Sequence, residues 1–327
     1  MDREDMEDLL STTASRVRTA WRRMVAHMRE ENSVDVISDR LAIGMRADLI
    51  TGVAVSAAAF AAGQHAAYVH AGQAAARRLR EAHAVTVAKK LLVFDAADPP
   101  AVAWAQRNRL DKIREITQEQ RDAIHGILVQ GARSGANPRV MAREIHETIG
   151  LTAKQEQIVA NYRRQLEQGQ LTEALARELT GGNADRTLEA ALRSRDAIPP
   201  TRIDSMVDAY RSNWTRMRAE TIGRTEGLRV AHQASDELYR QAVERGDLKP
   251  EQIVRTWVHR SGVRGKKDRS FHVSMNGQTR GYEEPFVSGL GNELMFPGDP
   301  DAPIEETAQC TCVVTVRVCR ALDPIAA

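Results

Sequence analysis

The spacing of apolar residues changes once along this chain of 327 residues, close to Pro250. Before Pro250, apolar side chains recur at steps of three and four residues, as they do along residues 17–28. This period is that of an amphipathic helix. After Pro250, two runs rich in β-branched residues, 254–258 and 313–318, are typical of strands. The sequence therefore predicts mainly α N-terminal and middle regions with a small C-terminal α+β module.

Composition supports a helical fold packed through small side chains. Aromatic residues make up 4% of the chain, which disfavours an aromatic-rich β-sandwich or barrel, and alanine, the best helix former, is abundant. The net charge of +2 excludes a strongly basic nucleic-acid coat and an acidic tail protein. The three cysteines cluster near the end and cannot staple the chain, so we expect a reducing compartment. The charged first residues lack an apolar signal core.

Proline-containing breaks divide the chain into three predicted regions. Asp98-Pro99-Pro100 interrupts the helical pattern, because proline lacks an amide donor and clashes with the preceding helical turn. Pro250 marks the change of texture. We therefore expect an N-terminal helical assembly region at 1–97, a helical middle region at 98–249 and a C-terminal α+β module at 250–327.

Capping signals predict where several helices begin. Ser33 should cap the second helix, and Thr152 should cap another further along the chain. Pro138 suits the first position of a helix. Thr117 and Gln120 have the spacing of a capping box, so a helix is expected to begin there.

Residues 49–69 contain no Asp, Glu, Lys or Arg and are about long enough to cross a hydrocarbon core as a helix. Many alanines, together with Gln64 and His65, make the run a weak membrane span. Gly52, Gly63 and the alanines bury little area, but small residues let helix backbones approach closely. Two interpretations stay open: a buried helix that contacts its own helices or those of a neighbouring copy, and a segment that meets a membrane.

Two cysteines near the end of the chain have the spacing of a metal-ligand pair. Cys310 and Cys312 project from one face if they lie on a strand, because side chains alternate there. With His272, and with His259 or Asp268 completing the set, they would supply the nitrogen and sulfur ligands that zinc prefers. The alternatives are plain packing of the thiols and a redox-dependent disulfide to a neighbouring segment.

A glycine-containing loop beside these candidate ligands concentrates cations. The five are Arg260, Arg264, Lys266, Lys267 and Arg269. Such a loop can follow a phosphate backbone without reading bases, which makes double-stranded DNA a candidate non-specific partner. The alternative is a loop that faces water, as runs of charge often do.

Catalysis is not indicated by the motifs of the chain. It has no Gly-rich phosphate loop, nucleophile elbow or His-Glu-x-x-His helix. A nuclease interpretation of His272 with Asn276 lacks a second downstream histidine, because His272 is the last one. Asn276-Gly277 instead suits a turn with positive φ.

Arg224 and Glu226 lie two apart on a helix and cannot face each other, so we expect a buried salt bridge from them to the C-terminal module.

Several motifs follow one another over roughly residues 110–318, with a core at about 201–318. They are Ile222-Gly223-Arg224-Thr225-Glu226, Trp257, Arg269, His272 with Met275-Asn276-Gly277, Glu284-Pro285-Phe286, Phe296-Pro297-Gly298-Asp299-Pro300 and Cys310-Thr311-Cys312. In order and spacing these motifs resemble the phage Mu protein F-like family, also called minor head or head morphogenesis proteins of tailed phages. Family members commonly read Asn-Cys-Arg-Cys where this chain reads Gln309-Cys310-Thr311-Cys312.

The resemblance implies a low-copy structural protein of a phage head rather than an enzyme. It implies a position inside the capsid near the portal, after synthesis in the host cytoplasm, and a part in head assembly and in genome packaging or delivery. The implied partners are the portal protein and capsid or scaffolding proteins. Two competing hypotheses stay open: a metal-dependent hydrolase or transferase centred on His272, Cys310 and Cys312, and a membrane-active ejection protein that uses residues 49–69.

Overall fold

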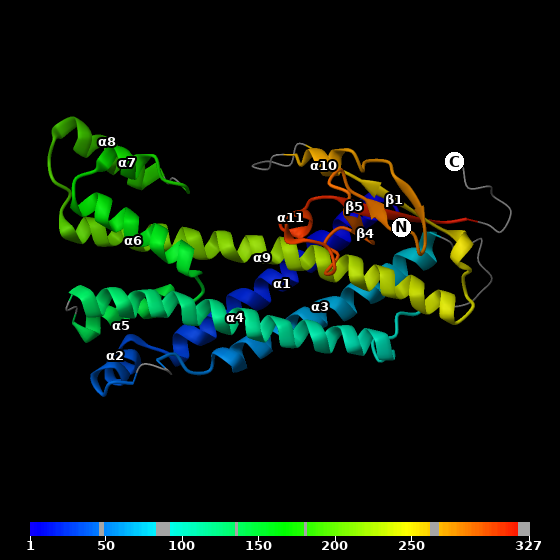
Figure 1. Ribbon diagram of the computed structural model, residues 1–327, viewed down its shortest axis with the longest axis horizontal. Helices are drawn as coiled ribbons and strands as arrows, with labels where there is room; N and C mark the ends of the chain where they lie inside the picture. Colours follow the sequence, from blue (N-terminus) through cyan, green and yellow to red (C-terminus); the bar gives the residue numbers. More distant parts are fainter. Residues whose placement is uncertain (46–48, 83–91, 135–136, 180–181, 262–267, 320–327) are drawn as a thin grey trace. The chain divides into compact units, whose positions relative to one another are not determined.

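The chain is mostly helical up to Glu244. The computed structural model describes residues 1–45, 49–82, 92–134, 137–179, 182–261 and 268–319 (Figure 1). The helices of this part are α1 (Arg3–Glu31), α2 (Val34–Ala42), α3 (Val53–Ala82), α4 (Pro99–Ser134), α5 (Pro138–Thr148), α6 (Ala153–Glu167), α7 (Leu171–Leu175), α8 (Gly182–Ser194) and α9 (Pro200–Glu244).

The elements that follow are short and mixed. They are the 3-10 turn η1 (Pro250–Gln252), β1 (Ile253–Val258), α10 (Ser270–Val273), β2 (Thr279–Gly281), β3 (Phe286–Val287), β4 (Glu293–Leu294), α11 (Ile304–Thr307) and β5 (Val313–Val318). The predicted fold class, mainly α with a small C-terminal α+β module, is confirmed.

The predicted helix starts at Ser33, Pro138 and Thr152 are confirmed. The Ser33 side chain accepts a backbone amide hydrogen bond at the start of α2. Pro138 is the first residue of α5, which Asn137 caps. Thr152 and Gln155 form a capping box at α6. These side chains satisfy amides that the first helical turn leaves without partners.

The predicted helix start at Thr117 is wrong, because α4 runs without a break through this position. The buried residues Ile116, Gln120, Ala123 and Ile127 continue one stripe in steps of three and four across the capping-box pattern. A continuous buried stripe stabilises the helix more than a local cap stabilises its end, so the cap pattern is not used.

The residues group into two compact units, each assembled from separate segments of sequence. Unit 1 holds residues 1–21, 60–109 and 221–327, and unit 2 holds residues 22–59 and 110–220. Helices α1, α3, α4 and α9 are each divided between the units. This grouping cuts across the three predicted sequential regions, which stay a prediction.

Glycines let helices of unit 1 approach closely. A Cβ on Gly227 of α9 would lie 2.5 Å from the Cα of Ala14 in α1, and a Cβ on Gly63 of α3 would lie 2.6 Å from the Cβ of Ala20. Both separations are shorter than carbon atoms tolerate, so these crossings require glycine. The expectation that small residues of the uncharged run bring backbones together is confirmed at Gly63.

The uncharged run continues into the core of unit 1 through α3. Tyr68 is buried, and its ring centroid lies 4.6 Å from that of Trp104 and 5.4 Å from that of Phe94. These aromatic contacts anchor a helix whose alanines bury little area individually. Among the described residues, no helix combines the length and the apolar character that a membrane span requires.

Unit 2 has apolar cores of its own. One joins α6, α7, α8 and the first part of α9, where the ring centroids of Tyr162 and Tyr210 lie 4.7 Å apart. The Arg177 guanidinium lies 4.6 Å from the Tyr162 ring centroid. A second core joins α2, α4 and α5 around Ile37 and Ile145. Unit 2 therefore buries enough apolar surface for its helices to pack on one another.

A three-stranded antiparallel sheet forms the base of the C-terminal module. The strand order is β2-β1-β5, and Val258 at the end of β1 pairs with Val313 at the start of β5. Met1 extends the pairing: its amine donates to the carbonyl oxygen of Val316 at 2.7 Å, and its carbonyl accepts from the Val316 amide at 3.1 Å. β3 and β4 form a separate hairpin. The sheet register places the residue after β1 beside the residue before β5.

Candidate metal centre

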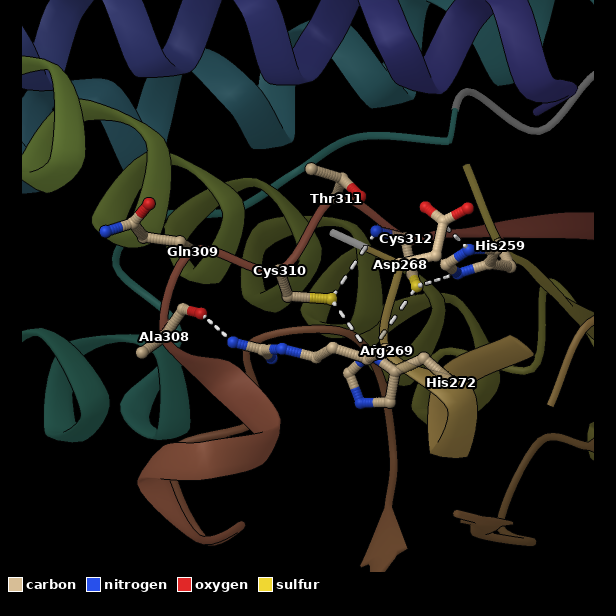
Figure 2. Close-up of a pocket in the computed structure, with 9 residues that line it drawn as sticks. All are labelled: His259, Asp268, Arg269, His272, Ala308, Gln309, Cys310, Thr311 and Cys312. Atoms are coloured by element: carbon tan, nitrogen blue, oxygen red, sulfur yellow. Dashed lines mark hydrogen bonds and ion pairs between the residues drawn. The ribbon is translucent and has the colours of Figure 1, made fainter. Parts of the chain in front are cut away.

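The candidate ligands come from three places in the C-terminal module. His259 follows β1, His272 lies on α10, and Cys310 and Cys312 precede β5. Because the last residue of β1 pairs with the first residue of β5, His259 and Cys312 meet at the same end of the sheet. Figure 2 shows these side chains converging on one pocket.

Cys310 and Cys312 face the same nitrogen of His272. Their Sγ atoms lie 3.5 and 3.7 Å from His272 Nδ1, and the three ligand atoms lie within 4.8 Å of one another. All three side chains are buried. A tetrahedral zinc ion with bonds of about 2.3 Å to sulfur and about 2.0 Å to nitrogen holds such atoms roughly 3.5 Å apart. The predicted proximity of these residues is confirmed, and the spacing suits zinc.

His259 is a fourth candidate ligand, and Asp268 lies behind it. His259 Nδ1 is 3.4 Å from Cys312 Sγ. His259 Nε2 is 3.4 Å from Asp268 Oδ1, on the other side of the ring. The sequence left these two residues as alternatives to complete the set. The structure directs His259 toward the thiols and Asp268 toward His259, which is where a carboxylate supports a metal-bound histidine.

Glu306 has the equivalent position behind His272. Its Oε2 lies 2.7 Å from His272 Nε2, and its side chain is fully buried. Sequence reasoning missed this residue as part of the site. Glu306 lies on the four-residue helix α11, in a stretch of sequence without periodic patterning, so only the tertiary fold brings it to His272.

The two thiols and the imidazole shift one another's pKa values. A hydrogen bond from Cys312 holds the pKa of the Cys310 thiol well below its usual range, and His272 adds to this effect against the cost of burial. The same hydrogen bond, together with burial, raises the pKa of Cys312. Of the two thiols, Cys310 therefore loses its proton more readily. A divalent cation would displace the thiol protons and neutralise the thiolate charge.

Trp257, Asn276 and Gly277, three of the predicted structural residues, hold the ligands in place. Trp257 is buried, with its ring centroid 5.6 Å from that of His272. Asn276 Oδ1 accepts a hydrogen bond of 2.9 Å from the His259 amide. Gly277 has a φ of +83°, and its amide donates to the Trp257 carbonyl at 2.8 Å. The predicted Asn276-Gly277 turn is confirmed, and it fixes the backbone of His259.

The Ile222–Glu226 segment of α9 contacts the loop before the cysteines through Thr225. Thr225 Oγ1 accepts a hydrogen bond of 3.1 Å from the Gln309 amide. Arg224 is exposed, so the expected buried salt bridge is wrong for this residue. Glu226 is buried and accepts a hydrogen bond of 3.2 Å from Gln64 of α3. Within this segment, Glu226 therefore packs α9 against α3, and Thr225 anchors the loop before the cysteines.

Arg269, which is predicted to contact DNA, holds the backbone of the site. Its guanidinium donates to the carbonyl oxygen of Glu306 at 3.0 Å and to that of Ala308. These bonds fix the chain between α11 and the cysteines. Arg269 is therefore engaged within the protein, and DNA contact by this residue stays a prediction.

Of the other four cations in that set, only Arg260 belongs to the described residues. Its Nε pairs with Glu7 Oε1 at 3.2 Å. Arg264, Lys266 and Lys267 lie outside the described residues. DNA contact by this loop stays a prediction.

Comparison with known proteins finds one partial relative. Uncharacterized protein YqbB of Bacillus subtilis (strain 168) is 32% identical over 101 residues, which make up 31% of this chain and 30% of that protein. The chain thus spans less than a third of the length of this relative. No family model and no solved structure matches the chain.

Proposed function

We propose that this chain is a minor head protein of a tailed phage, internal to the capsid and associated with the portal, and that a structural zinc ion stabilises its C-terminal module. The observation that carries the metal assignment is the convergence of His272, Cys310 and Cys312, with His259 beside them. The head-protein assignment is supported by the ordered motifs over residues 110–318, several of which build or brace this site.

The ligand set favours a structural ion over a catalytic one. With His259 as the fourth ligand, two sulfur and two nitrogen atoms would complete a tetrahedral shell, which leaves no position for water or substrate. The histidines precede the irregular segment 276–309 and the cysteines follow it, so a shared ion closes this segment at its base. Ordering a long segment costs conformational entropy, which metal binding offsets.

Metal content of the full-length protein tests the zinc assignment. Protein refolded with zinc should hold one ion per chain by elemental analysis. Cys310→Ser, Cys312→Ser and His272→Ala should each lower this value, whereas Cys319→Ser should not, because Cys319 is buried in the same module but outside the cluster. Zinc that stays bound after Cys310 and Cys312 are both replaced would overturn the assignment.

The location of the chain tests the head-protein assignment. We expect it at low copy number in purified particles, protected from protease while the capsid is closed, and bound to portal protein in pull-down experiments. Capsid and scaffolding proteins are further proposed partners, and self-association through residues 1–97 would concentrate copies during assembly. Absence from purified particles would contradict this function.

Packaged double-stranded DNA is a proposed non-specific partner through the 260–269 loop. With a net charge of +2, the chain should bind DNA weakly, without sequence preference and with strong dependence on salt. Affinity that survives high salt would argue for another surface.

A cavity at the candidate metal centre supports one enzymatic alternative. It has a volume of about 280 Å³ and is lined by the candidate ligands together with Asp268 and Arg269 (Figure 2). If His259 were a base rather than a ligand, three ligands would leave an open position, as in metal-dependent hydrolases or transferases. His259→Ala separates the two functions: it should weaken zinc binding in a structural site and leave binding intact in a catalytic one.

A further inference from the structure

Glu306 joins a candidate metal ligand to a hairpin that contributes no ligand. Its Oε2 lies 2.7 Å from His272 Nε2. Its Oε1 accepts hydrogen bonds of 2.7 Å from Ser288 Oγ and 2.8 Å from Asn292 Nδ2. Glu306 is 0% exposed, so water does not compete for these bonds. One buried carboxylate therefore receives three hydrogen bonds from two different parts of the module.

The donors in this network determine which nitrogen of His272 faces the thiols. The Asn292 amide nitrogen can only donate, and the Ser288 hydroxyl already accepts from backbone amides, so Glu306 accepts from both. An ionised Glu306 also accepts from His272 Nε2, which places the imidazole proton on that nitrogen. His272 Nδ1, the nitrogen beside both sulfur atoms, then carries the free lone pair that a metal needs.

Ser288 organises the turn between β3 and β4. Its hydroxyl oxygen accepts hydrogen bonds from the amides of Leu290 at 3.2 Å and Asn292 at 3.3 Å. Gly291 has a φ of +82°, which closes the turn. The hydroxyl proton goes to Glu306. Loss of the Glu306 carboxylate would therefore release the turn and the imidazole together.

We propose that Glu306 is a positioning residue that couples metal binding at His272 to the order of the β3–β4 hairpin. This inference rests on the proposed metal site and extends it to a segment that contributes no ligand. The coupling is reciprocal by linkage: a bound ion stabilises the hairpin, and an ordered hairpin strengthens metal binding. A histidine held in the correct tautomer also loses less freedom when the metal binds.

Metal affinity of Glu306→Gln in the full-length protein tests the positioning role. Zinc affinity, measured by competition with a chelator of known strength, should fall by about 10- to 100-fold. Glutamine keeps the size of the side chain but has one acceptor oxygen, and its NH₂ group opposes either the His272 N–H or the hairpin donors. The d–d spectrum of cobalt bound in place of zinc should change as well, because the ring of His272 loses its fixed orientation.

Asp299→Asn is the matched control. Asp299 is also a buried carboxylate of the irregular segment, and it accepts hydrogen bonds from the amides of Met295 and Asp301. These contacts brace a loop without touching a candidate ligand. We expect its zinc affinity to stay within about threefold of the wild-type value, since it lacks a ligand to orient.

Hydrogen exchange at residues 288–292 tests the coupling. Zinc should slow exchange of these amides in the wild-type protein and have little effect on them in Glu306→Gln. Ser288→Ala serves as a milder variant should Glu306→Gln fail to fold. It keeps the bonds from His272 and Asn292 to Glu306 but removes the hydroxyl that organises the turn, so zinc should still bind while its protection of 288–292 becomes weaker than in the wild type.

The outcomes separate this inference from the proposed zinc site. Wild-type protein that binds no zinc, or binds it independently of Cys310, would overturn both. Binding that depends on Cys310 but is equal in Glu306→Gln and wild type would overturn the positioning role alone. Exchange at 288–292 that ignores zinc in the wild type, or protection by zinc that is undiminished in Ser288→Ala, would overturn the coupling.

Discussion

Both ring nitrogens of His232 have partners only when the imidazole is neutral. Nδ1 donates to the Leu228 carbonyl at 3.0 Å, and Nε2 accepts from the Val314 amide at 3.3 Å. A second proton on the ring would place an N–H donor at Nε2 directly opposite the Val314 amide, which is also a donor. His232 is 2% exposed, and this burial lowers its pKa to about 4.

The free energy of unfolding should therefore decrease as the pH falls from about 6.5 toward 4. The folded pKa of His232 lies below the unfolded value of about 6.5, so the unfolded chain binds more protons in this window. The full effect of this one group is about 3 kcal/mol. Urea unfolding of wild type and His232→Gln, both with chelator so that metal release adds nothing, should show a shallower pH dependence in the variant. Parallel curves would contradict the assignment.

Gln309 adopts a backbone conformation that asparagine tolerates better than glutamine does. Its φ is +54°, in the left-handed region, and its amide is fixed by Thr225 just before the first cysteine. Gln309→Asn should raise the free energy of unfolding by about 0.5 kcal/mol, because asparagine tolerates this region better. Gln168→Asn, at a φ of −89°, should bring no such gain. Equal urea midpoints for both variants would contradict the expectation.

At the scale of elements, the crossing of α1 with α9 depends on a missing side chain. Gly227→Ala places a methyl group 2.5 Å from the Ala14 Cα, so the helices must separate. We expect a loss of about 1–3 kcal/mol, as for other overpacked contacts. Gly126→Ala in α4 is the control: a Cβ there meets nothing within 4 Å, and alanine should add roughly 0.5–1 kcal/mol through helix propensity. Calorimetry of the two variants should show shifts of opposite sign.

Periodicity predicted the helices and the two long strands, β1 and β5, because the formation of a helix or a strand depends on residues that are close in sequence. The boundary at Thr117 was wrong because a cap pattern is local, whereas the buried stripe of α4 extends on both sides of it. Arg224 was expected to form a buried salt bridge because it cannot face Glu226, two residues away on the helix, yet it lies on the exposed side of α9. Element types could be predicted from sequence, as could the starts of α2, α5 and α6, whereas the start of α4 could not.

The residues of the candidate site also divide into those that could be predicted from sequence and those that could not. Cys310, Cys312 and His272 could be predicted to lie together because two cysteines that are two residues apart on a strand share one face and, with His272, match the ligands that zinc prefers. Glu306 could not, because its donors Ser288 and Asn292 come from an irregular segment whose path only the folded module determines. The sequence carries the chemistry of the ligands but not the contacts that orient them.

At the scale of the whole molecule, the candidate metal centre ties together the two ends of the irregular segment 276–309. Unit 2 has apolar cores that do not include this segment. Removal of zinc should therefore loosen 276–309 and leave the helices of unit 2 folded, because loss of the ion withdraws the tether without exposing those cores.

Limited proteolysis of the full-length protein, with cleavage sites mapped by mass spectrometry, measures this difference. Chelator should accelerate cleavage within 276–309, and added zinc should reverse the effect, while cleavage within 110–220 stays constant. A Cys310→Ser, Cys312→Ser double variant should be cleaved rapidly in 276–309 under all conditions, since it cannot hold the ion. Equal cleavage of the wild type with and without chelator would mean that packing around Trp257 and Glu306, rather than a metal, holds this segment in place.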